Sequence, residues 1–143
     1  MTQSKHTGCC LCGAVRFELA APLRDVIVCH CRQCAQWTGY AVAATAVGAG
    51  QFTLLKGADV LTWFRSSDHA ERGFCAKCGS SLFWKPKDGA RISVLAGALD
   101  PPTGLKIAAH IFMDSRSDFD EVVSGAPQFG GSAGALGRPP DTT

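Results

Sequence analysis

Short runs of β-forming residues, separated by Gly, Pro, Asp and Ser, follow one another along most of the chain. The runs span residues 26–28, 41–47, 52–55, 60–65, 81–84, 92–95 and 107–112. Val, Ile, Thr, Leu and aromatic residues supply most of their side chains, which is typical of strands. Only residues 32–38 and 117–123 are expected to form helical turns. The pattern predicts a mainly β domain of several small antiparallel sheets with few short helices.

The segment from residue 8 to residue 18 alternates between two sets of side chains. Cys10 and Cys12 share one parity, whereas Val15 and Phe17 take the other. Residues two apart in a strand point to the same side. We therefore expect a strand here, with both cysteines aimed in one direction.

The chain changes character after Phe129, where Gly, Ser, Ala and Pro predominate. Such a segment buries too little apolar surface to offset its ordering entropy. We expect residues 130–143 to form a flexible tail. Residues 5–129 are expected to form a single folded domain, which is an ordinary domain size.

Composition narrows the classes of function. Hydrophobic residues make up 46% of the 143 residues, the formal net charge is +2, and the 14 Lys and Arg are scattered. A scattered charge argues against nucleic acid and against an anionic membrane surface as partners. No run approaches the roughly 18 apolar residues of a membrane span, and the N-terminus lacks a signal-like apolar core. We expect a cytoplasmic protein.

Cysteine is the most informative residue type. Seven of the eight cysteines fall into the clusters Cys10-Leu-Cys12, Cys29-His-Cys31, Cys31-Arg-Gln-Cys34 and Cys75-Ala-Lys-Cys78. In a reducing compartment, close-spaced cysteines serve metals more often than disulfides. Zinc binds thiolates tetrahedrally at about 2.3 Å, and a Cys-x-x-Cys turn supplies two of its ligands.

The first and last clusters together supply four ligands. Cys10 and Cys12 would meet Cys75 and Cys78, where Gly79 suits a left-handed turn just after the second cysteine. A fully protein-ligated zinc site is structural and contributes to folding. A different partition would join Cys10 and Cys12 to the middle cluster, which leaves the last cluster short of ligands.

The middle cluster supplies three ligands, Cys29, Cys31 and Cys34. Three protein ligands leave one tetrahedral position for water or substrate, as in catalytic zinc sites. His30, Cys9 or His110 could instead fill this position. His30 alternates with its cysteine neighbours, so it is expected to face away from their ion. Cys9 is expected to be a buried or free thiol.

These clusters lie within longer stretches that resemble the glutathione-dependent formaldehyde-activating enzyme / centromere protein V family. The matching stretches are Gly8–Phe17, Cys29–Cys34 with Thr38-Gly39, Phe74–Ser80 with Leu82–Trp84, Gly97–Pro101, His110–Phe112 and Ala126–Phe129. The resemblance covers residues 5–129. The chain departs from the family pattern at Phe119, where a Trp is frequent, and in its Cys9-Cys10 doublet.

The resemblance implies a β-tent-like fold stapled by zinc. It implies a structural zinc on Cys10, Cys12, Cys75 and Cys78, and a second zinc on Cys29, Cys31 and Cys34. The activity that it implies is carbon–sulfur lyase chemistry, in which glutathione adds reversibly to formaldehyde to give S-hydroxymethylglutathione. His110 is then the best candidate for a general acid or base.

The residues around the clusters suggest how such a substrate would bind. A thiol could be activated at the three-cysteine zinc, with Cys29, Cys31, Cys34 and His110 forming the catalytic site. Arg32, Lys77 and Arg91 could meet the carboxylates of glutathione.

Two other functions compete with this hypothesis. A non-enzymatic zinc module that binds a protein partner is the main alternative. A zinc ribbon that binds nucleic acid is disfavoured, because the two Cys-x-x-Cys turns are 40 residues apart and no basic stripe accompanies them.

Overall fold

The computed structural model describes residues 5–141 as a mainly β fold of two sheets, as the sequence predicts. The smaller sheet has the order β1-β2-β5, with strands Lys5–Cys9, Arg16–Ala20 and Phe52–Lys56. The larger sheet has the order β10-β3-β4-β9-β8-β7-β6. Its strands, in chain order, are β3 Val26–Cys29, β4 Val42–Gly48, β6 Leu61–Arg65, β7 Ala70–Cys75, β8 Ser81–Pro86, β9 Arg91–Leu95 and β10 Ile107–Ile111.

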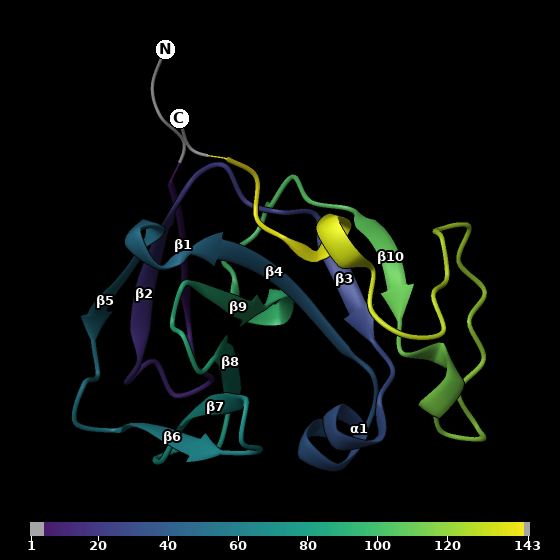
Figure 1. Cartoon of the computed structure of the whole chain (residues 1–143). Helices are drawn as coiled ribbons and strands as arrows, with labels where there is room; N and C mark the ends of the chain where they lie inside the picture. Colours follow the sequence, from purple (N-terminus) through teal and green to yellow (C-terminus); the bar gives the residue numbers. More distant parts are fainter. Residues whose placement is uncertain (1–4, 142–143) are drawn as a thin grey trace.

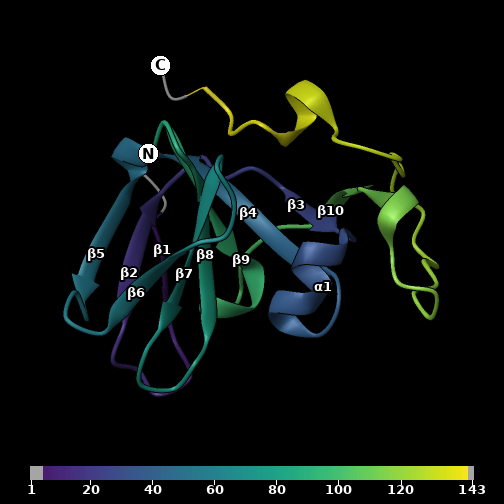
Figure 2. The same cartoon turned by 60° about the horizontal axis from the view of Figure 1, so that its bottom comes forward.

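The smaller sheet and β10 lie at opposite sides of the molecule, and the helix α1, Arg32–Thr38, lies beyond the end of β3 (Figures 1 and 2). Pairing in the larger sheet is antiparallel except between β3 and β10, which run parallel. Four short 3₁₀ turns complete the described elements: η1 Ala49–Gln51, η2 Ala96–Ala98, η3 Met113–Ser115 and η4 Gly134–Gly137. In residues 5–141 no helix has the length and apolar character that a bilayer crossing requires.

The hydrophobic core lies where the two sheets face each other. Phe17 of β2 and Phe83 of β8 are fully buried, and their rings pack edge to face at 5.1 Å. Phe52 of β5 packs on Phe83 in the same way, also at 5.1 Å. Burial of each such ring stabilises the fold by about 1.5–3 kcal/mol. Cys10 and Cys75 belong to this core.

The helix α1, Arg32–Thr38, forms where the sequence predicts it. The backbone N–H of Cys34 donates to the Cys31 side chain, which caps the first turn of the helix. Gly39 ends the helix in the left-handed conformation, at φ 98°. A possible ligand residue thus also fixes where the helix begins.

Two sequence expectations are wrong, and one strand is not predicted. The strand expected over residues 8–18 is two strands, β1 and β2, joined by a turn in which Gly13 has φ 78°. Residues 117–123 form a loop rather than a helical turn. The strand β7 was not expected at all, because Ala70-Glu-Arg-Gly-Phe-Cys75 is too polar to stand out as a β run.

The C-terminal segment returns to the body of the domain. The backbone N–H of Phe112 donates to Gly131 O at 2.9 Å, and Arg24 Nη1 donates to Gly137 O at 2.5 Å. Residues 142 and 143 of the expected tail lie outside the described range. The boundary at residue 129 and the flexibility of the tail stay predictions.

Candidate metal centres and the adjoining cavity

Four cysteine side chains from two distant turns converge beside the core. Cys10 and Cys12 come from the turn between β1 and β2, Cys75 is the last residue of β7, and Cys78 lies in the turn that follows it. Their sulfur atoms all lie within 4.8 Å of one another; the Cys10 and Cys12 sulfurs are 3.6 Å apart, and those of Cys12 and Cys75 3.9 Å. We call this group the four-cysteine cluster. It could hold one metal ion.

The turn, rather than a strand, brings Cys10 and Cys12 together. Cys10 N–H donates to Val15 O at 3.1 Å, and Val15 N–H donates to Cys10 Sγ at 3.2 Å. Burial acts to raise the pKa of Cys10, but the hydrogen bonds from Val15 and from neighbouring thiols outweigh it and lower this pKa. The expected convergence of the two side chains is present, but strand parity is not its cause.

The second half of the cluster is a tight turn. Gly79 adopts the left-handed conformation, at φ 79°, as its place after Cys78 predicts. Ser80 Oγ lies 3.2 Å from Cys78 Sγ, and hydrogen bonds from its hydroxyl and backbone N–H lower the pKa of Cys78 to about 5. Because zinc binds thiolate, a lowered thiol pKa favours metal binding at neutral pH.

Three further cysteines meet at the junction of β3 and α1. Cys29 is the last residue of β3, Cys31 caps α1, and Cys34 lies in its first turn. Their sulfurs also lie within 4.8 Å of one another, and we call this group the three-cysteine cluster. Hydrogen bonds from Cys29 and then Cys34 lower the pKa of Cys31 to about 2, while the one with Cys31 raises the pKa of Cys29. The thiols thus share protons, which a metal ion would displace.

Neither cluster includes the other candidate ligands. Cys9, His30 and His110 are outside both groups of possible metal ligands in the described residues. All eight cysteines are free thiols. The four-plus-three partition of the sequence therefore matches the spatial grouping, whereas the alternative of Cys10 and Cys12 with the middle cluster does not.

A cavity of about 640 Å³ adjoins the three-cysteine cluster. All three cysteines line it, together with Trp37 of α1 and Trp84 of β8. Four arginines also line it: Arg24, Arg72, Arg91 and Arg138. We call it the arginine cavity. Its volume falls within the range of small-molecule binding sites.

Only one of the three basic residues that the sequence suggested as contacts for glutathione lines the cavity. Arg91 lines it, whereas Arg32 and Lys77 are absent from its lining. Sequence reasoning missed Arg24, Arg72 and Arg138, which come from segments far apart in the chain. No local pattern marks them, because only the fold brings them to one place.

A chain of hydrogen-bonded polar side chains begins at His30, between Cys29 and Cys31, and is buried except at Tyr40. His30 Nδ1 lies 2.5 Å from Asp120 Oδ2, and His30 Nε2 lies 2.9 Å from His110 Nδ1. Tyr40 donates its hydroxyl to Asp120 Oδ1 at 3.1 Å. Because its ring is held by these partners, His30 is turned away from Cys29 and Cys31. No local pattern marks Asp120 as a site residue, and it lies 90 residues from His30 in the chain.

His110 follows His30 in this chain of hydrogen bonds, so it is more remote from the cysteines than His30 is. It is buried, it does not line the arginine cavity, and its Nε2 has no hydrogen-bond partner within the described residues. Burial, followed by the charge of His30, lowers the pKa of His110, against the opposing effect of Asp120. The neutral imidazole is thus favoured.

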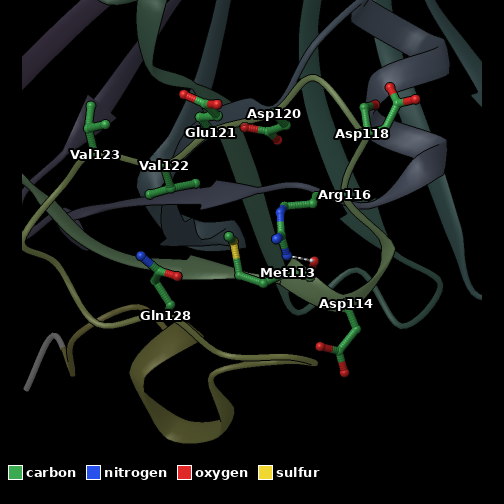
Figure 3. A pocket seen from close by; sticks show the side chains of 10 residues that line it. Met113, Asp114, Arg116, Asp118, Asp120, Glu121, Val122, Val123 and Gln128 are labelled. Atoms are coloured by element: carbon green, nitrogen blue, oxygen red, sulfur yellow. Dashed lines mark hydrogen bonds between the residues drawn. The ribbon is translucent and has the colours of Figure 1, made fainter.

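A second cavity, of about 650 Å³, lies over the loop that carries Asp120. Figure 3 shows Arg116 reaching to Met113, whose carbonyl accepts a hydrogen bond from its guanidinium at 2.9 Å. Asp114, Asp118, Asp120 and Glu121 also line this cavity. The two cavities therefore differ in charge: one is rich in arginine and the other in carboxylate.

Residues 5–115 match the family model described as glutathione-dependent formaldehyde-activating enzyme. This range contains both cysteine clusters and His110, but not Asp120. It ends before the C-terminal segment that forms part of the arginine cavity.

Two individual relatives extend this finding. A protein of Halomonas elongata named "Putative glutathione-dependent formaldehyde-activating enzyme" is 26% identical over 132 residues, which cover 82% of this chain and 80% of the relative. A crystal structure of a Rhodobacter sphaeroides protein superimposes with a TM-score of 0.59. It is 21% identical and covers 85% of this chain and 98% of its own, so it supports the fold alone.

Proposed function

The chain belongs to the glutathione-dependent formaldehyde-activating enzyme family, and from this premise we propose that it is a zinc-dependent carbon–sulfur lyase. Its substrates are a small thiol, such as glutathione, and an aldehyde, such as formaldehyde. The thiol sulfur bonds to the aldehyde carbon, and the thiol proton ends on the aldehyde oxygen. The product is an S-hydroxymethyl adduct. The reverse reaction breaks the same carbon–sulfur bond and returns both substrates.

One observation carries this proposal: the three-cysteine cluster faces the arginine cavity with all of its members. Three close sulfur atoms suit zinc and leave one tetrahedral position for a ligand from the cavity. Zinc held by Cys29, Cys31 and Cys34 would lower the pKa of a thiol that reached it, which supplies a thiolate at neutral pH.

Residues of the cavity then orient the reactants. Trp37 and Trp84 form apolar walls that limit the access of water to the reacting groups. Arg72 Nη1 lies 3.8 Å from Cys34 Sγ, so its positive charge offsets part of the negative charge that the thiolates bring. His110 has no place on the cavity wall, and in this proposal it acts through His30 as a positioning residue.

The four-cysteine cluster has a structural role in the same proposal. It joins the turn after β1 to the turn after β7, and two of its members lie in the core. A zinc ion there would link segments more than 60 residues apart. We also propose a cytoplasmic location, because a reducing compartment keeps close-spaced cysteines available for metal.

The test is an exchange measurement on the zinc-loaded protein. Glutathione and ¹³C-formaldehyde form the adduct spontaneously, and NMR exchange spectroscopy measures its rate of formation and breakdown. We expect the protein to accelerate both directions, Cys34→Ser to abolish the acceleration, and Cys9→Ser, outside both clusters, to preserve it. A folded, two-zinc protein that gives no acceleration would overturn the proposal in favour of a non-enzymatic zinc module.

A further inference from the structure

The arginine cavity contains an unusual excess of positive charge. Four of its lining residues are arginines, and no Asp or Glu lines it. None of these arginines forms an ion pair with a carboxylate in residues 5–141, where the ion pairs involve other side chains. Arginines inside proteins are normally paired. Of the four, Arg72 is buried, Arg24 and Arg91 are half-buried and Arg138 is exposed. The thiolates of the three-cysteine cluster offset part of this positive charge, and an anionic ligand would offset the rest.

Arg72 is the most deeply placed of the four. It is 4% exposed, its Nη2 donates to Gln33 Oε1 at 2.8 Å, and its guanidinium lies 4.7 Å from the ring centre of Trp37. Its Nε is buried without a hydrogen-bond partner. A buried N–H without a partner is unfavourable, so this group is suited to receive an acceptor from a ligand. Its contact with Cys34 places it directly beside the three-cysteine cluster.

Arg24 is held in place by the backbone alone. Its guanidinium donates to the carbonyl groups of Asp25, Ala44 and Gly137, at 3.1, 2.7 and 2.5 Å. Burial and the nearby charge of Arg91 lower the pKa of Arg24 to about 10. Since that pKa still lies well above neutral pH, Arg24 keeps its positive charge beside Arg91.

Arg91 and Arg138 approach the cavity from separate segments. Arg91 lies with its guanidinium 5.6 Å from the ring centre of Trp84, and Arg138 follows the 3₁₀ turn η4 in the C-terminal segment. Guanidinium groups bind carboxylates and phosphates through paired N–H donors. Arginines from four segments thus surround a space next to three thiols.

We propose that the arginine cavity binds a small polyanion, a thiol whose two or more acidic groups contact the arginines while its sulfur reaches the three-cysteine cluster. The thiol part rests on the proposed function, whereas the anion part rests on the cavity alone. Glutathione carries an ammonium group as well as two carboxylates, and no carboxylate of the cavity can pair with it. A thiol with several acidic groups and no cationic group therefore binds more tightly than glutathione.

The test is isothermal titration of the full-length, zinc-loaded protein with a graded set of ligands. Mercaptosuccinate carries a thiol and two carboxylates, 2-mercaptoethanol a thiol alone, succinate the two carboxylates alone, and inorganic phosphate a different anion. We expect mercaptosuccinate to bind at least tenfold more tightly than both 2-mercaptoethanol and glutathione. Succinate or phosphate should compete with it, and the tighter of these two anions identifies the acidic group that the cavity prefers.

Variants locate the site. Arg91→Gln and Arg138→Gln should each weaken mercaptosuccinate by about tenfold, as loss of a charge-assisted hydrogen bond predicts, and leave 2-mercaptoethanol unchanged. Arg32→Gln is the matched control, because Arg32 is exposed and does not line the cavity. Thermal melting verifies that each variant is folded.

The outcomes separate the two proposals. Equal affinity for mercaptosuccinate and 2-mercaptoethanol, or equal losses in Arg91→Gln and Arg32→Gln, would overturn the polyanion site. If glutathione binds as tightly as mercaptosuccinate, the predicted exclusion of cationic groups is wrong. Failure of the proposed lyase reaction would instead leave the binding of succinate or phosphate intact.

Discussion

The two cysteine clusters use the same ligand atom in different surroundings. In the four-cysteine cluster, Cys10 and Cys75 are almost completely buried and form part of the hydrophobic core. In the three-cysteine cluster, every member lines a cavity that carries arginines. Half of the first cluster therefore packs into the core, whereas Cys12 is exposed, and the whole of the second cluster faces groups that suit a ligand.

The difference lies in how the chain reaches each cluster. The four-cysteine cluster joins two turns that are separated by more than 60 residues, so its ligands close a long loop. The three-cysteine cluster draws all its ligands from six consecutive residues, and the end of β3 and the start of α1 already hold them. Loss of metal from the first cluster releases a long-range link, whereas loss from the second leaves local structure that other contacts support.

The largest effect should follow from Cys75→Ser. Cys75 is fully buried, and its loss removes one ligand from the link and places a hydroxyl in the core. Structural zinc contributes on the order of 10 kcal/mol in small zinc domains, which exceeds the stability of many domains. We expect an unfolded protein by far-UV circular dichroism, with a reduced zinc content. Cys9→Ser is the control, and a folded Cys75→Ser protein with one zinc would contradict the structural role.

The second effect is the order in which the two clusters lose zinc when a chelator is added in increasing amounts. With increasing chelator, the three-cysteine cluster should lose its zinc first, because three ligands bind less strongly than four and the cavity admits the chelator. The first equivalent should leave with no change in circular dichroism, and the second should unfold the domain. Simultaneous loss of both equivalents with the fold would show that the two clusters are equally structural.

The sequence predicts which cysteines group together better than it predicts the residues that pack around the two cysteine clusters. Close spacing of cysteines is a local signal, and so is the short helix with a capping residue at Cys31 and a glycine at its end. The sequence does not predict the strand β7, because Glu71 and Arg72 make it polar. The reason for Arg72 being there is visible only in the fold, where it contacts Gln33 and Cys34 of α1, 39 and 38 residues earlier in the chain.

The buried network behind the cysteines was also beyond sequence reasoning. Asp120 belongs to a loop whose composition resembles a helical turn. Its partner His30 lies 90 residues earlier in the chain. The convergence of Cys10 and Cys12 was predicted with the wrong geometry, since a turn and strand parity both bring residues i and i+2 together. The local pattern of residues does not encode which side chains meet across long distances in the sequence.

The third effect concerns this network. Asp120→Asn removes the charge that faces His30, which lies between two members of the three-cysteine cluster. We expect about 1–3 kcal/mol less stability toward urea. Zinc affinity at that cluster should fall by less than the roughly 10- to 100-fold typical of groups bonded directly to metal ligands, because His30 only connects Cys29 to Cys31 in the chain. Asp118→Asn, an exposed neighbour, is the control. Unchanged zinc affinity in Asp120→Asn would separate the network from the metal site.

The smallest effect tests how the four-cysteine cluster keeps its thiolates. Ser80 lowers the pKa of Cys78 to about 5, so Ser80→Ala should raise that pKa. A thiol with a higher pKa competes for protons at a higher pH, and the metal is then released earlier as the pH falls. We expect the midpoint of zinc release from this cluster, followed with a chromogenic indicator, to move upward by roughly half a pH unit. Release from the three-cysteine cluster should not move, because Ser80 does not line the arginine cavity. Ser81→Ala is the neighbouring control, and an equal shift in both variants would mean that the Ser80 hydroxyl is not the group that holds Cys78 as a thiolate.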